Sequence, residues 1–157
     1  MVTISIREAA FIDIPAMHDV RLAVRENRLA DPSWLTPEVY RAYLADTGAG
    51  NTWVAEIDGE LAGFCVGRIA EADLWALFVD PAREGRGVGR ALLAVATQWL
   101  FARGAASIAL TTSPDTRADH FYASAGWQRG DIDHKGEVAY RLSAASRASL
   151  ALQETPC

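Results

Sequence analysis

Apolar and polar residues repeat with two different periods along the 157-residue chain, and the two periods divide it into strands and helices. Alternation with period two predicts strands over 4–7, 52–57, 60–69, 108–112, 127–132 and 138–142. Helical spacing of apolar residues predicts helices over 13–28, 36–45, 88–103 and 116–125. Asp58-Gly59 joins two of these strands as a tight hairpin, because a type I′ turn needs positive φ at both central residues.

A continuous apolar run, Leu74 to Val79, lies between Asp73 and Asp80-Pro81 and is typical of a central strand covered on both faces. Asp13 is expected to cap the first helix, and Gly104 to end the third. The order strand, two helices, three strands, helix, strand, helix, two strands predicts one mixed α/β domain. We assign residues 1–142 to it and the Ala- and Ser-rich residues 143–157 to a C-terminal tail.

Composition excludes several classes of protein. Fifteen Lys and Arg against twenty Asp and Glu give a net charge of −5, which disfavours nucleic acid as a partner. The chain has no apolar run long enough to cross a membrane and no signal peptide at its N-terminus. Its two cysteines, Cys65 and Cys157, make neither a disulfide framework nor a metal site. A cytoplasmic domain without membrane contact is the expectation.

Candidate chemistry is concentrated in the loop after the apolar strand. Gly85, Gly87 and Gly89 alternate with other residues and lead directly into a helix, and Arg86 and Arg90 add positive charge. Such a loop lets backbone N–H groups and the positive end of the helix bind a phosphate. A P-loop would need Lys-Ser or Lys-Thr after the last glycine, and a dinucleotide fingerprint would need a further glycine at a position that this chain does not provide. A flexible connector without ligand is the alternative.

Two motifs resemble the GCN5-related N-acetyltransferase (GNAT) family. In the first, Val79-Asp80-Pro81 leads to Gly87-x-Gly89, as in the coenzyme A motif Gln/Arg-x-x-Gly-x-Gly/Ala, although the first position is Glu84. A carboxylate so close to a pyrophosphate would be repelled unless it turned away or paired with Arg83 or Arg86.

The second motif lies downstream, with Asp115 and Trp127 in place of the usual Asn and Phe. It reads Asp115-x-x-Ala118-x-x-Phe121-Tyr122-x-x-x-Gly126-Trp127. The resemblance implies the GNAT fold, a twisted and mostly antiparallel central sheet flanked by helices.

The resemblance also implies an acetyl-CoA site and no metal. Backbone groups of Leu77 and Val79 would hold the pantetheine arm and polarise the thioester, and Tyr122 would protonate the leaving sulfur unless it is only a packing aromatic. Asp115 would hold pantetheine or, more simply, cap its helix. The loop would bind the pyrophosphate through Gly85, Arg86, Gly87, Val88, Gly89 and Arg90.

The amine acceptor would lie against the first two helices and the last strands. Those helices and the apolar strand contribute Arg25, Glu26, Asn27, Arg28, Trp34, Tyr40, Tyr43 and Trp75. The general base stays open between Glu56, Glu71, Asp73, Glu137 and water. Asp131, Asp133 and His134 form a polar turn more readily than a metal site.

The expected function is therefore transfer of the acetyl group of acetyl-CoA to a primary amine of a small molecule or peptide, by direct attack in a ternary complex. The alternative is a non-catalytic module of the same fold that senses acyl-CoA. The family resemblance further implies a homodimer, the commonest oligomer in general.

Overall fold

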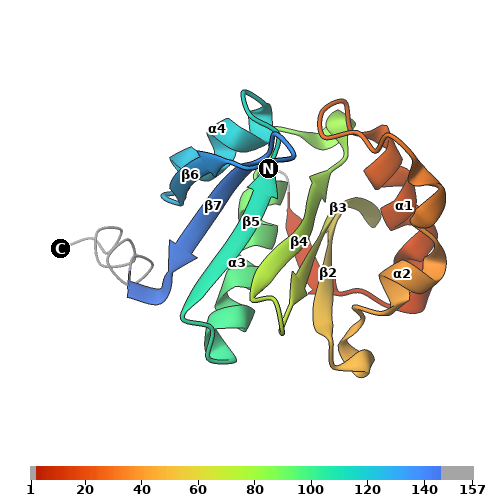
Figure 1. Ribbon diagram of the computed structural model, residues 1–157. Helices are drawn as coiled ribbons and strands as arrows, with labels where there is room; N and C mark the ends of the chain where they lie inside the picture. Colours follow the sequence, from red (N-terminus) through yellow and green to blue (C-terminus); the bar gives the residue numbers. More distant parts are fainter. Residues whose placement is uncertain (1–2, 146–157) are drawn as a thin grey trace.

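A seven-stranded sheet forms the centre of the computed structural model, which describes residues 3–145 (Figure 1). The spatial order is β1-β2-β3-β4-β5-β7-β6, and only β4 and β5 run parallel. The strands are β1 (Ile4–Glu8), β2 (Gly50–Ile57), β3 (Glu60–Arg68), β4 (Asp73–Val79), β5 (Ser107–Thr112), β6 (Gln128–Ile132) and β7 (Val138–Ser143). The predicted order of elements is confirmed.

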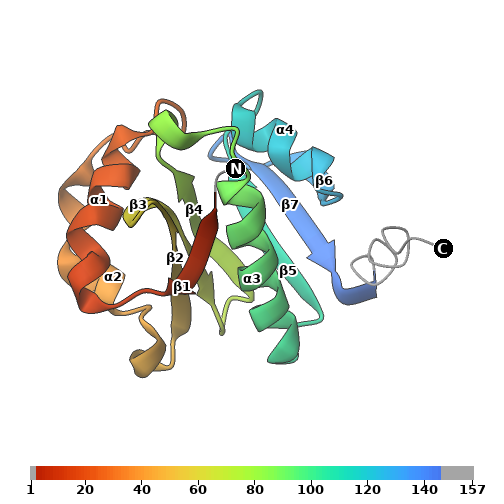
Figure 2. The ribbon, with the colours of Figure 1, turned by 180° about the vertical axis from the view of Figure 1, so that it is seen from behind.

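Helices cover the sheet on both faces, as the two opposite views show (Figures 1 and 2). One face carries α1 (Ile14–Ala23) and α2 (Pro37–Arg41), and the other carries α3 (Val88–Ala102) and α4 (Arg117–Ser124). Among the residues that the structure describes, no helix is long and apolar enough to cross a membrane. The mixed α/β fold expected from the sequence is therefore the observed one.

Two apolar clusters, one on each face, make the core. Leu92 and Tyr122 belong to the cluster under α3 and α4, whereas Met17 and Tyr40 belong to the one under α1 and α2. A β-bulge in β4 fixes which side chains enter each cluster: Val66 pairs with Ala76 and Gly67 with Leu74, so that Trp75 is an extra residue. Trp75 and Ala76 consequently both face α1 and α2, and Leu77 faces α3.

The predicted first helix is too long at its C-terminal end. It ends at Ala23, and Val24 is already extended (ψ 143°). Asp13 stands at the N-cap position of this helix as predicted, but its side chain makes no capping hydrogen bond with it. The carboxylate instead accepts from the Ala10 N–H at 2.7 Å and from both terminal nitrogens of Arg7 at 2.8 Å. The contact with Ala10 closes the 3-10 turn over Phe11–Asp13, and the ion pair with Arg7 joins that turn to β1.

Other predicted boundaries shift for local reasons. The second helix, predicted over 36–45, ends at Arg41, and a separate 3-10 turn follows over Ala45–Thr47. The final strand includes Ser143, which pairs with Ser107, so the predicted tail begins inside β7, and residues 146–157 lie outside the described residues. The strand β4 is only partly covered: Leu74 and Ala76 are buried, and its other residues are half-buried.

The turns follow the sequence closely. Asp58 and Gly59 have φ values of +53° and +77°, as a type I′ hairpin requires. Gly104, with φ +92°, follows the last turn of α3 as predicted. Both positions favour residues that tolerate the left-handed region.

A buried carboxylate fixes α4 against the last two strands. Asp119 accepts from Arg129 Nε at 3.1 Å and Nη2 at 3.2 Å, and the Tyr140 hydroxyl donates to the same carboxylate. The Arg129 guanidinium, together with the Tyr140 hydroxyl, holds the pKa of Asp119 well below its usual range. The position of α4 therefore depends on an ionised carboxylate.

Gly50 begins β2 against the backbone of β3. A Cβ at Gly50 would lie 2.1 Å from the Gly67 carbonyl oxygen, whereas a Cβ at Gly67 would meet Leu100 Cδ1 at 3.5 Å. We expect Gly50→Ala to lower the free energy of unfolding by ~2 kcal/mol, and Gly67→Ala to change it by less than ~1 kcal/mol. Urea denaturation measures both, and equal stability of the two variants would contradict this close approach.

Asp119→Asn removes the charge and keeps the shape. Because the pKa of Asp119 is lower in the folded state, its stabilisation is present above the unfolded pKa of about 3.9 and is lost as pH falls. The variant should melt below wild type at neutral pH, and the gap should close between about pH 5 and about pH 2. Asp131→Asn, an exposed position on β6, is the control; a gap independent of pH would refute the assignment.

Candidate active site

The loop between β4 and α3 exposes a row of backbone donors. Gly85 and Gly87 have φ values of +77° and +89°, in the left-handed region that glycine adopts without strain. The first backbone hydrogen bond of α3 runs from the Ala91 N–H to the Gly87 oxygen at 3.0 Å. The N–H groups of residues 88–90 therefore point beyond the end of the helix, where its dipole is positive. This geometry suits an anion such as phosphate.

The side chains of the loop fall into two groups: one packs in the core, and the other carries charge at the surface. Val88 is only 1% exposed, so it anchors α3 in the core and offers a ligand its backbone alone. A Cβ at Gly89 would lie 3.6 Å from Val79 Cγ2 and 3.7 Å from the Phe121 ring, so α3 starts close to both β4 and α4. Arg86 and Arg90 are exposed. The structure thus brings the predicted residues 85–90 together at one helix end.

Glu84 is not paired as the sequence suggested. Arg83 binds Asp80 at 3.0 Å and also Glu60, while Glu84 faces Arg117 of α4, with 3.8 Å between Oε2 and Nη1. This exposed pair is weak, but it places a cation beside the carboxylate. The repulsion expected between Glu84 and a bound phosphate is reduced accordingly.

The strands β4 and β5 meet only at their beginnings. One residue pair, Asp73 with Ala109, joins them, supported by the hydrogen bond from the Ala109 N–H to the Ala72 oxygen at 3.1 Å. Beyond it, the β5 side of β4 has no strand partner in the described part of the chain. Backbone N–H and C=O groups there are available to a ligand.

Register shows which groups of β4 face this gap. Along an antiparallel ladder, residue pairs that exchange backbone hydrogen bonds alternate with pairs that do not. The Asp80 N–H donates to the Ala62 oxygen, so this pair is one of the hydrogen-bonded pairs between β4 and β3. Ala76 and Phe78 therefore bond to β3, opposite Val66 and Phe64. The N–H and C=O groups of Leu77 and Val79 consequently point toward β5, into the gap, as their predicted role requires.

Tyr122 of α4 lies on the α3 face of the sheet and is 6% exposed. Its ring packs between Phe121 (centroids 5.2 Å apart) and Trp127 (5.7 Å). Burial, with a smaller contribution from Cys65, raises the pKa of the Tyr122 phenol, which therefore stays protonated at neutral pH. Its hydroxyl has no hydrogen-bond partner and is not among the fully buried unpaired atoms of residues 3–145, so it keeps contact with solvent.

Asp115 does not cap α4. The cap is Thr116, whose hydroxyl accepts from the Asp119 N–H at 3.2 Å, while Asp115 has φ +60° and donates its own N–H to Asp119 Oδ2. The spacing Thr-x-x-Asp is a capping-box pattern that the sequence contained. The sequence analysis did not identify the role of Asp119, the acidic member of this pattern, because the sequence does not show that Arg129 and Tyr140 lie beside it.

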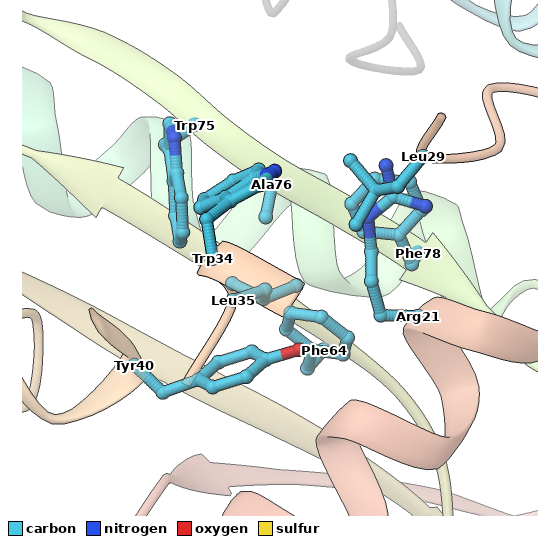
Figure 3. A pocket seen from close by; sticks show the side chains of 9 residues that line it. All are labelled: Arg21, Leu29, Trp34, Leu35, Tyr40, Phe64, Trp75, Ala76 and Phe78. Carbon is cyan, nitrogen blue, oxygen red and sulfur yellow. The ribbon is translucent and has the colours of Figure 1, made fainter. Parts of the chain in front are cut away.

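A cavity of about 180 Å³ lies on the opposite face, between the sheet and α1 and α2 (Figure 3). Its wall includes three of the predicted acceptor residues, Trp34, Tyr40 and Trp75, and Tyr43 packs against Trp75 with centroids 5.2 Å apart. The full lining is Arg21, Leu29, Trp34, Leu35, Tyr40, Phe64, Trp75, Ala76 and Phe78.

The remaining predicted acceptor residues lie in the segment after α1 and hold it in place. Asn27 Oδ1 accepts from the Ser113 N–H at 3.0 Å, and Glu26 Oε1 accepts from the Arg117 N–H at 3.1 Å. Arg25 and Arg28 are exposed and outside the cavity wall. Two contacts thus connect the segment after α1 to the β5–α4 loop and to the first residue of α4.

None of the four candidate bases lines the cavity. Glu56 pairs with Arg7, and Asp73 pairs with Arg68 at 2.6 Å, with Glu71 at 3.8 Å from the same guanidinium. Glu137 lies in the β6–β7 turn. Within residues 3–145, no carboxylate is among the side chains that line the cavity.

The polar residues before β7 form a turn that Asp133 closes with hydrogen bonds. Asp133 accepts from the Lys135 N–H at 2.8 Å and from the Glu137 N–H at 3.0 Å. Among the described residues, no group of three His, Cys, Asp or Glu side chains is placed to hold a metal ion.

Six lining residues were missed by the sequence analysis, and Arg21 is the charged one among them. Its Cζ lies 4.1 Å from the centre of the Phe78 ring (Figure 3). The spacing contained a signal, because Arg21 follows the buried Met17 by four residues and so shares its helix face.

Comparison with known proteins agrees with this geometry. L-2,4-diaminobutyric acid acetyltransferase of Nocardia farcinica is 32% identical over 87 residues, 52% of this chain and 45% of that protein. Mycothiol acetyltransferase of Kineococcus radiotolerans is 30% identical over 132 residues, 83% of this chain and 39% of that protein. The matches therefore span less than half of each curated relative.

A solved structure shows the same fold. PaiA N-acetyltransferase of Thermoplasma acidophilum, in complex with coenzyme A, superposes with a TM-score of 0.71 at 16% identity and covers 90% of this chain and 99% of its own. The model of the acetyltransferase (GNAT) family matches residues 17–127, which include most of α1 and all of β4, the glycine loop and α4. The chain belongs to the GNAT family of acetyltransferases.

Proposed function

We propose that this protein transfers the acetyl group of acetyl-CoA to a primary amine of a small molecule or peptide, by direct attack within a ternary complex. The observation that carries the proposal is the unpaired edge of β4, where the backbone groups of Leu77 and Val79 face a gap between two strands. That gap lies between the anion-binding end of α3 and the cavity on the other face of the sheet.

Binding of acetyl-CoA would use groups that are already placed. The N–H groups of residues 85–90, with Arg86 and Arg90, suit the pyrophosphate, and the edge of β4 suits the amide-containing pantetheine arm. Asp115 is a poorer candidate for pantetheine, because its backbone N–H is bonded to Asp119 and its side chain makes no hydrogen bond or ion pair within residues 3–145. A bound acyl-CoA supplies an activated thioester.

Leu77, Val79 and Tyr122 would then act in two steps of the transfer. Backbone N–H groups of Leu77 and Val79 donate toward the acyl oxygen as it gains negative charge, which is where preorganised donors lower a barrier most. Tyr122 keeps its proton until a leaving thiolate can take it, because burial raises the pKa of the phenol. The amine loses its proton to water, since no carboxylate lines the cavity among the described residues.

Two further expectations stay predictions. The family resemblance implies a homodimer, which light scattering tests. The cytoplasmic location expected from the composition of the chain is the other. The sensing module remains the competing function, and Glu84 in the loop favours it. The carboxylate of Glu84, however, faces Arg117, and the backbone donors of the loop do not depend on that side chain.

The loop assignment is tested by ligand-induced stabilisation. Acetyl-CoA at about 100 times its Kd should stabilise the native protein by ~2.7 kcal/mol and raise its Tm, whereas ATP and NADH should not. Gly87→Asp places a carboxylate where phosphate is expected, at φ +89°, and should abolish the Tm shift. Gly48→Asp, at φ +77° in a distant turn, should retain it; a retained shift in Gly87→Asp would exclude the loop.

The proton donor is tested by Tyr122→Phe. Removing one hydroxyl should lower kcat about 100-fold, because general acid catalysis typically contributes that much or more. The Tm shift with acetyl-CoA should equal that of wild type, since the ring packing of Tyr122 is kept. An unchanged kcat would remove Tyr122 from the reaction, and absence of turnover with any amine despite binding would favour the sensing module.

A further inference from the structure

The cavity under α1 and α2 contains an unpaired cation. Arg21 Nη1 is the one buried side-chain nitrogen or oxygen in residues 3–145 that has no hydrogen-bond partner. Arg21 forms none of the ion pairs of the described chain, and its guanidinium lies over the ring of Phe78, 4.1 Å from the ring centre. The residue as a whole is half-buried, but its Nη1 is cut off from solvent, and buried polar atoms without a partner are rare.

The surroundings of Arg21 make this arrangement costly in the free protein. Burial lowers the pKa of its guanidinium, which remains protonated at neutral pH because the ordinary value lies so high. Leaving a buried charge without its partner is destabilising. Function commonly requires groups that lower the stability of the free protein, so an unpaired guanidinium nitrogen at a cavity wall marks a candidate binding site.

The cavity wall presents donors and apolar surface. Arg21 and the indoles of Trp34 and Trp75 can only donate hydrogen bonds, and the Tyr40 hydroxyl is engaged with His18 Nδ1 at 3.0 Å. The other lining side chains are hydrocarbon: Leu29, Leu35, Phe64, Ala76 and Phe78. A ligand that satisfies this wall brings hydrogen-bond acceptors and negative charge on an apolar body.

Size and position restrict the ligand further. A cavity of ~150 Å³ is large enough to hold benzene, so about 180 Å³ admits a small apolar group together with one polar head. The wall includes Ala76 and Phe78, the neighbours of Leu77 on β4. A molecule held there lies next to the backbone edge at which the proposed transfer takes place.

We propose that the acceptor is a small amine that carries a carboxylate and an apolar body, such as an apolar amino acid, and that Arg21 binds its carboxylate. This inference rests on the proposed transferase function and specifies its substrate class. A planar guanidinium and a carboxylate form two parallel charge-assisted hydrogen bonds, which gives geometric selectivity that an ammonium group lacks. Arg21 is a specificity-determining residue in this scheme.

The test compares acids with amides that differ in charge alone. Release of CoA from acetyl-CoA is measured with apolar α- and ω-amino acids and with their primary carboxamides. In wild type, kcat/KM for the preferred acid should exceed that of its amide at least about tenfold. Arg21→Met should remove this preference, and Arg21→Lys should retain part of it. Equal rates for acid and amide in wild type would overturn the proposal, as would an acid preference that survives in Arg21→Met.

Two readouts separate this inference from the transferase proposal. Quenching of tryptophan fluorescence by the N-acetylated acid reports binding beside Trp34 and Trp75 without any transfer, and Arg21→Met should abolish it. The same variant should melt at or above the wild-type temperature and keep its Tm shift with acetyl-CoA. Quenching without turnover would refute the transferase and keep the carboxylate site, whereas a large loss of stability would make Arg21 structural and overturn the proposal.

A dicarboxylic acyl-CoA is the other source of a carboxylate near Arg21. Succinyl-CoA is therefore assayed as donor with the same amines in wild type and Arg21→Met. We expect acetyl-CoA to be the better donor in both proteins. A wild-type preference for succinyl-CoA that disappears in Arg21→Met would assign the guanidinium to the donor and overturn its assignment to the acceptor.

Discussion

The early end of the pairing between β4 and β5 is the constraint on which the site depends. Only Asp73 and Ala109 pair, so β4 continues to Val79 with one backbone edge open. Buried backbone groups are almost always paired, which makes an open edge at the centre of a sheet expensive unless solvent or a ligand satisfies it. The contacts of Asn27 and Glu26 connect the segment after α1 to the β5–α4 loop and to the first residue of α4.

The two faces of the sheet contribute different chemistry to that edge. On one face, α3 and α4 are held by a continuous core, and the ion pair of Asp119 with Arg129 fixes the helix that carries Tyr122. On the other face, the packing of α1 and α2 leaves a cavity. Rigid packing thus supports the groups that the proposed transfer needs preorganised, while the cavity lies on the face where we propose that the acceptor binds.

Prediction from sequence succeeded where local patterns decide the structure. The glycine loop and the Asp58-Gly59 hairpin follow from φ preferences of single residues. It failed where contacts between distant residues matter: the first helix ends at Ala23, and in the segment after it Asn27 bonds to Ser113, 86 residues away in sequence. The cap of α4 moved from Asp115 to Thr116 for a local reason that the Thr-x-x-Asp spacing contained. The sequence places Arg21 on the same helix face as Met17, but it does not show that Arg21 Nη1 has no hydrogen-bond partner within residues 3–145.

Net charge and local charge have opposite signs in this protein, and the difference bears on which ligands it can bind. A chain with a net charge of −5 repels anions at long range. Salt screens that repulsion beyond about 8 Å, whereas a buried or partly buried group acts with little screening. Hydrogen-bond donors stand at the end of α3, with Arg86 and Arg90, and at the cavity, with Arg21. Glu84, the carboxylate at the start of the glycine loop, faces Arg117. The anionic donor and the anionic acceptor that we propose would therefore be attracted at contact distance, where geometry can discriminate between ligands.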